Sequence, residues 1–135
     1  MPILKAMRPL DPTVDETIAC SPRAPSVARR VLEQAATDLD VDLLHDAQLL
    51  VSEVVTNSIK HSGSDDPIRL RVWARNDGLK VEVADGGLGF NTAPPADPGE
   101  GEGGRGLLIL ESLADRWGTS CDMRARVWFE LTARA

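Results

Sequence analysis

The stretch that decides the fold is residues 43–61, LLHDAQLLVSEVVTNSIKH, where apolar residues recur at helical spacing. Within it Glu53, Asn57 and His61 follow one another at intervals of four, which places them on one face, about 6 Å apart per step. A carboxylate that can take a proton, followed one turn later by an amide oxygen suited to a hard cation, is what a magnesium–nucleotide site requires of a helix. The same spacing also fits an exposed stripe of an amphipathic helix, in which His61 is a helix-end residue that suits the helix dipole.

Two glycine-rich segments follow this helix: residues 85–89 read DGGLG and residues 99–106 read GEGEGGRG. The segment 86–104 is rich in glycine and proline and poor in apolar residues, so we expect a lid over a site, with a tolerated surface insertion as the alternative. Its end runs into a further predicted helix. Free backbone amides at a helix start, where glycines allow close approach, can hold an anion.

Composition narrows the class of protein. With 135 residues, 42% of them hydrophobic, the chain fits one globular domain. The longest aliphatic run is residues 107–110, so we expect neither a signal peptide nor a membrane span, and a cytoplasmic protein. A net charge of -6 argues against nonspecific nucleic-acid binding and favours a protein partner or small ligand. Cys20 and Cys121 lack metal-ligand spacing and are expected to be small buried residues rather than a zinc site or disulfide.

The periodicity predicts the order β, α, α, β, β, lid, α, β, β, with residues 1–12 as a loose terminus and residues 13–135 as a single domain. This order indicates an α+β fold, a two-layer α/β sandwich whose mixed, mostly antiparallel sheet is covered on one face by helices. Neither a doubly wound alternation nor a P-loop signature is present. The expected elements are a strand at 13–20, helices from 21–26 to 39 and up to 61–63, strands at 68–74 and 79–83 joined by Asn76-Asp77-Gly78, a helix at 106–117, and strands at 119–123 and 125–131.

Three motifs in this order resemble the nucleotide boxes of the GHKL superfamily, which includes gyrase, heat-shock chaperone, histidine kinase and mismatch-repair ATPases. Residues 53–61 (EVVTNSIKH) resemble its N box, residues 85–89 its first glycine box and residues 104–107 (GRGL) its second. The short length, LADRWG at 113–118 and the terminal VWFEL look most like the stand-alone anti-sigma-factor serine kinases. The resemblance covers about residues 21–131 and implies the Bergerat ATP-binding fold, with ATP and Mg²⁺ as cofactors.

The resemblance also implies a role for each motif residue. Glu53 would orient or deprotonate the attacking hydroxyl of a partner serine or of water, and Asn57 would bind Mg²⁺ through its side-chain oxygen. Asp85 would accept a hydrogen bond from the adenine amino group, and its alternative is an ordinary turn aspartate. The other expected nucleotide contacts are Gly87 and Gly89 near the base and ribose, and Gly104, Arg105, Gly106, Leu107 and Lys60 at the phosphates.

The function implied is an ATP-binding anti-sigma-type regulator with serine/threonine kinase activity toward an anti-anti-sigma (STAS-type) partner. It would hold a sigma factor by protein contacts, without direct nucleic-acid or membrane binding. A homodimer is compatible with this function. One departure stands out: the family's last hairpin usually carries a Gly-Thr pair whose hydroxyl helps hold adenine, whereas residues 123–127 read MRARV and Thr119 lies too early to replace it. Two alternatives therefore remain, a non-catalytic ATP-binding interaction module and the ATPase unit of a histidine kinase. The second is disfavoured because no phosphoacceptor helix precedes Ser21.

Overall fold

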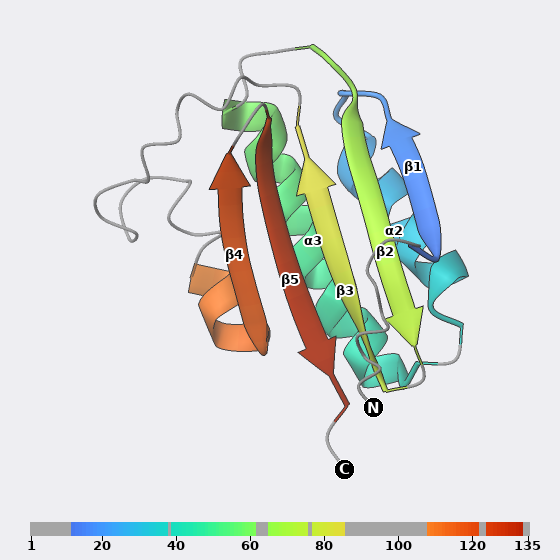
Figure 1. Ribbon diagram of the computed structural model, residues 1–135. Coiled ribbons are helices and arrows are strands. Elements are labelled where there is room, and N and C mark those ends of the chain that lie inside the picture. Colours follow the sequence, from blue (N-terminus) through green and yellow to red (C-terminus); the bar gives the residue numbers. More distant parts are fainter. Residues whose placement is uncertain are drawn as a thin grey trace.

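The computed structural model describes residues 12–37, 39–61, 65–75, 77–85, 108–121 and 124–133. Figure 1 shows a sheet with helices behind it, in the predicted order along the chain. Residues 108–113 form a further short helix. The elements are β1 (Val14–Ile18), α2 (Ala24–Ala35), α3 (Val41–His61), β2 (Ile68–Arg75), β3 (Gly78–Ala84), β4 (Arg116–Cys121) and β5 (Ala125–Thr132).

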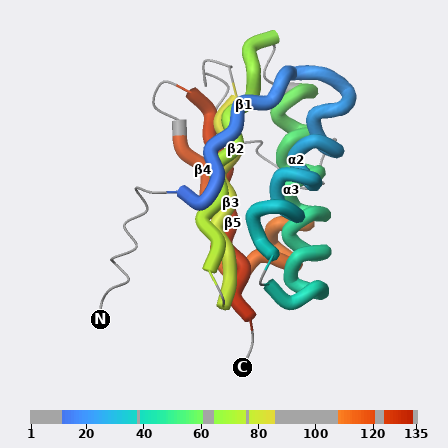
Figure 2. Tube along the Cα trace, turned by 90° about the vertical axis from the view of Figure 1, so that its right-hand side faces the viewer, coloured from blue at the N-terminus to red at the C-terminus, as the bar shows by residue number. Residues whose placement is uncertain are grey.

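The molecule has two layers. In the edge-on view of Figure 2, the strands form one layer, and α2 and α3 form a second layer against one face of the sheet. The predicted α+β sandwich, with helices on one face of the sheet, is therefore confirmed. None of the helices in the described ranges is long and apolar enough to cross a lipid bilayer.

The strands lie in the order β1-β2-β3-β5-β4. All four described pairings are antiparallel, in agreement with a mostly antiparallel sheet. Arg75 pairs with Gly78, so only two residues connect β2 to β3, which confirms the hairpin predicted at the Asn-Asp-Gly sequence. The pairing of β3 with β5 joins the first hairpin to the second and makes one continuous sheet.

The core lies between the sheet and α3. Alternate residues of the central strands point inward and are fully buried, as are helix residues three or four positions apart. Phe129 on β5 is the largest of these side chains, and burying a side chain of this size contributes about 1.5–3 kcal/mol. The other fully buried large side chains are Leu32, Leu50, Val51, Val55, Ile68, Leu70, Val72, Val81, Val83 and Leu110.

The prediction of a helix over residues 106–117 is wrong at its C-terminal end, because the helix stops at residue 113. The amide of Asp115 donates to the carbonyl of Glu130 at 2.9 Å, and its carboxylate accepts a hydrogen bond from the Thr132 amide at 2.6 Å. These bonds draw Arg116 and Trp117 into β4, so pairing with β5 overrides the local helical spacing.

The cysteine prediction is only partly correct. Cys20 is half-buried rather than buried, since it comes just after β1, the first strand of the sheet. The side chain of Cys121 lies outside the described part of the chain. β1 and β4 form opposite edges of the sheet, so Cys20, just after β1, and Cys121, the last residue of β4, belong to opposite edges.

Candidate nucleotide site

Helix α3 is held against α2 along one flank by a polar bracket around Arg29. The Arg29 guanidinium donates to the Ser52 hydroxyl at 2.8 Å, and the Gln48 amide donates to the Arg29 carbonyl at 3.0 Å. The Ser52 hydroxyl in turn donates to the Gln48 carbonyl at 2.9 Å. These bonds fix how α3 is rotated about its own axis, and therefore which residues turn away from α2.

Glu53 and Asn57 lie on the opposite flank of α3. Glu53 follows Ser52 directly, so it points about 100° further round the helix, and Asn57 is one turn beyond it. Both side chains are half-buried, whereas Val54 and Val55 beside them face the core. The predicted pair thus borders the core on the side of the helix that α2 does not cover, where a ligand can reach both groups.

Asp85 comes directly after β3 and is only 8% exposed. Its backbone amide donates to the carbonyl of Ala125 at 3.0 Å, which extends the β3–β5 ladder by one residue beyond Ala84 and Arg126. A carboxylate at this depth is costly unless hydrogen bonds compensate for the lost water. The position therefore suits a carboxylate that accepts a bond from a buried donor, as the prediction for adenine requires.

The structure brings these three residues to the same end of the molecule. In Figure 1 the C-terminal half of α3, the end of β3 and the start of β5 all lie toward the top, and Figure 2 agrees. Lys60, one turn beyond Asn57, is exposed at this end of α3. The oxygen donors of Glu53 and Asn57 fit a hard cation, and Lys60 adds positive charge for a polyphosphate.

The remaining predicted contacts lie outside the described residues, and their assignment stays a prediction. They include the whole predicted lid, residues 86–104, and the side chain of His61. The nucleotide contacts concerned are Gly87, Gly89, Gly104, Arg105, Gly106 and Leu107.

Sequence reasoning missed the position of Ala125 at this site. Because the register pairs Ala84 with Arg126, Ala125 stands opposite Asp85, and directly opposed residues of antiparallel strands point to the same face. The side chain of residue 125 is thus the neighbour of the Asp85 carboxylate. The pairing of Ala125 with Asp85 depends on the strand register, and the local sequence MRARV at 123–127 does not reveal that register.

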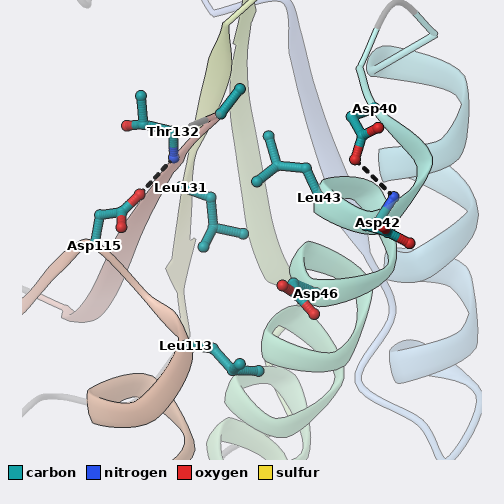
Figure 3. Close-up of a pocket in the computed structure, with 9 residues that line it drawn as sticks. Asp40, Asp42, Leu43, Asp46, Leu113, Asp115, Leu131 and Thr132 are labelled. Atoms are coloured by element: carbon teal, nitrogen blue, oxygen red, sulfur yellow. Dashed lines mark hydrogen bonds between the residues drawn. The ribbon is translucent and has the colours of Figure 1, made fainter. Parts of the chain in front are cut away.

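A cavity of about 450 Å³ lies at the other end of α3 and has a different character. Figure 3 shows aspartates around it and leucines between them. Asp40 caps α3 by accepting a bond from the Asp42 amide at 3.1 Å, and Asp115 accepts one from Thr132. Asp46 adds a further carboxylate, so the cavity repels phosphate and does not fit a nucleotide. Of the predicted site residues that the structure describes, none lines it.

Comparison with known proteins agrees with this reading of the fold. A family model described as a histidine kinase-like ATPase domain matches residues 18–126. The serine-protein kinase RsbW of Listeria monocytogenes is 34% identical, and RsbW of Staphylococcus aureus is 33% identical; each match covers 55% of this chain and 56% of the relative. The chain thus spans about half the length of the curated relatives it matches.

A solved structure gives the same fold. The histidine kinase domain from the Erythrobacter litoralis EL346 blue-light activated histidine kinase has a TM-score of 0.54 and 22% sequence identity, covering 81% of this chain and 59% of that one. The family model spans most of the chain, and its match takes in Glu53, Asn57 and Asp85. This chain therefore belongs to the histidine kinase-like ATPase domain family, which implies the use of a nucleotide.

Proposed function

We propose that this protein is an ATP-binding anti-sigma-type regulator with serine/threonine kinase activity toward an anti-anti-sigma partner. The observation that carries the proposal is the placement of Glu53 and Asn57 on the flank of α3 that α2 does not cover, at the same end of the molecule as the buried Asp85. Membership of a nucleotide-using family and the similarity to serine-protein kinases named RsbW support it. A sigma factor as the held partner and a cytoplasmic location belong to the same proposal.

Three residues bind and orient the nucleotide. The Asp85 carboxylate accepts a hydrogen bond from the exocyclic amino group of adenine, and its burial strengthens that bond by excluding water. Asn57 would hold Mg²⁺ through its amide oxygen, and the metal would neutralise phosphate charge. Lys60 adds a cation at the same end of the helix, and the backbone amides of the second glycine box, residues 104–107, hold the phosphates.

Glu53 acts as the general base. It accepts the proton of the attacking serine hydroxyl while the serine oxygen forms its bond to the γ-phosphorus. MgATP supplies the phosphoryl group, and the bond between that group and ADP breaks, so the products are phosphoserine and ADP. Asn57, one helical turn away, would hold the Mg²⁺ that binds the phosphates, and Glu53 is left to accept the proton.

The test uses the full chain with Mg²⁺, γ-labelled ATP and each anti-anti-sigma candidate from the same genome. Phosphoserine on one of them, located by mass spectrometry, is the expected result. Glu53→Gln should keep ATP affinity while slowing transfer by about 10²- to 10⁴-fold, the usual effect of losing a general base. Glu33→Gln, on the exposed side of α2, is the matched control and should transfer at the wild-type rate.

A wild-type protein that binds ATP but labels no candidate would replace the kinase proposal with the non-catalytic binding module. That second function is favoured by one observation: the residue opposite Asp85 is Ala125, which offers a methyl group and no hydroxyl. Transfer at the wild-type rate by Glu53→Gln would assign the base to another residue.

A further inference from the structure

One face of the sheet is not covered by helices in the described part of the chain (Figure 2). We call it the open sheet face; it is formed by the strand residues that alternate with the buried positions. On β2, for example, Leu70 and Val72 point into the core, so the residues on either side of them point outward. The same alternation holds on β3 around Val81 and on β5 around Phe129.

The open sheet face is positively charged although the chain as a whole is acidic. It has three carboxylates, Asp15, Glu82 and Glu130, and six cations, a net of +3. The whole chain carries -6, so the rest of the molecule carries -9. The six cations are Arg69, Arg71, Arg75, Lys80, Arg116 and Arg126.

The carboxylates of this face lie in ion pairs. Arg69 binds Asp15 through two nitrogens, at 2.9 and 2.7 Å, and Arg71 binds Glu82. Arg116 lies 3.6 Å from Glu130 at the far end of the sheet. The three carboxylates are therefore largely neutralised in place, and the strand residues of this face include more positive than negative groups.

Two tryptophans lie between these charges and are held in position. The Lys80 ammonium stands between them, 5.3 Å from the ring centre of Trp73 and 5.1 Å from that of Trp128. The ring of Trp128 lies directly on Gly118, where an added Cβ would come within 2.8 Å of it. Both tryptophans are half-buried. Ordered aromatic rings among arginines are typical of binding hot spots, since little side-chain entropy is lost on docking.

We propose that the open sheet face is a docking surface for an acidic protein, one that offers carboxylates to the cations and apolar side chains to the two tryptophans. Charge complementarity selects this partner. A second copy docking through the same face would bring +3 against +3, which disfavours it. Nucleic acid is disfavoured because a net charge of +3 is small for the many phosphate contacts that such binding requires.

This inference is independent of the proposed kinase activity. The face lies on the side of the sheet away from α3, which carries Glu53 and Asn57, so nucleotide and partner can be bound together. Changes confined to the open sheet face should therefore alter docking without altering MgATP affinity, and the two proposals can fail separately.

The experiment measures fluorescence anisotropy of a labelled peptide in which glutamate and leucine alternate, titrated with the full chain at low salt. Lys80→Glu lowers the charge of the face from +3 to +1 and removes the cation between the rings, so it should weaken binding about tenfold. The matched control is Arg30→Glu on the exposed side of α2, which changes the net charge equally and should bind as the wild type. Circular dichroism and MgATP affinity confirm that both variants are folded.

Added salt should weaken the wild-type complex, and a lysine–leucine peptide should not bind. Equal losses in Lys80→Glu and Arg30→Glu would overturn the proposal, because net charge and not this face would then be responsible. Tighter binding of a single-stranded thymine oligonucleotide than of the acidic peptide would assign the face to nucleic acid instead. A wild-type dimer in sedimentation that Lys80→Glu converts to monomer would assign it to a second copy.

Discussion

Replacing Ala125 with threonine should raise the affinity of this protein for MgATP. Ala125 accepts a hydrogen bond from the Asp85 amide through its carbonyl, and its side chain stands opposite that of Asp85 on the same face of the sheet. Opposed side chains of antiparallel strands have Cβ atoms about 4.5–5.5 Å apart, close enough for a threonine hydroxyl to share a bound adenine with the carboxylate. A β-branched residue also suits the start of β5.

The size of the effect follows from one added hydrogen bond. Such a bond contributes about 0.5–1.5 kcal/mol net, which corresponds to about a 2- to 12-fold lower dissociation constant. Ala125→Val is the matched control, because valine has nearly the shape of threonine and no hydroxyl. Any gain from packing or from strand propensity alone appears in both variants.

Isothermal titration calorimetry with MgATP on the wild type, Ala125→Thr and Ala125→Val measures the difference directly. The threonine variant should bind more tightly than both other proteins, with a more favourable enthalpy. Equal affinities of the threonine and valine variants would refute the reasoning, since residue 125 would then not adjoin the base. A threonine gain that persisted in an Asp85→Ala background would likewise separate Ala125 from the Asp85 site.

The remaining predictions concern the metal, the sheet and acid stability. Asn57→Ala should weaken MgATP binding by about 10- to 100-fold, the scale of one lost interaction with a charged group; calorimetry that finds no loss, or no effect of Mg²⁺ on the wild type, would contradict the N-box assignment. Gly78→Ala should lower the free energy of unfolding by about 1–3 kcal/mol in urea titrations, because the new Cβ would overlap the backbone oxygen of Leu131; a wild-type midpoint would show that the strands can separate without cost. The hydrogen bond from Arg69 lowers the pKa of Asp15 below its ordinary 3.8. The folded state therefore binds a proton at Asp15 less readily than the unfolded state does, and the ion pair stabilises the fold at pH values above 3.8. The stability difference between wild type and Asp15→Asn should therefore be largest near neutral pH and disappear as acid titrates the folded carboxyl, and a difference that grows on acidification would contradict this pairing.

Local sequence patterns were sufficient to predict most of the helices and strands. Helix α3 was predictable because its apolar positions recur every three or four residues. The first hairpin was predictable because strict alternation on both sides of Asn-Asp-Gly allows a tight turn and little else. The same reasoning failed at Arg116 and Trp117. Their spacing fits a helix, but they form backbone hydrogen bonds with β5, which lies further along the chain, and so belong to a strand.

The candidate site likewise has one part that the sequence predicted and one part that required the fold. Its helix half, Glu53 and Asn57, came from a spacing within one element, and the match of residues 18–126 to the histidine kinase-like ATPase family agrees with the order of the motifs. The roles of these side chains stay predictions, since they depend on a bound nucleotide. The sheet half needed the fold, because the distance between Asp85 and Ala125 along the chain says nothing about their pairing.

What the sequence determined by itself is therefore the set of elements, their order and the residues suited to metal and phosphate, because periodicity and side-chain chemistry act over one turn or one strand. What only the tertiary structure decided is which strands pair and in which register, and so what faces what. The register places a methyl group beside Asp85 and gathers six cations and two tryptophans on the sheet face that no helix of the described ranges covers. The physical reason is that strand pairing joins residues distant in sequence through uniform backbone hydrogen bonds, so the choice is made by how all the elements pack together.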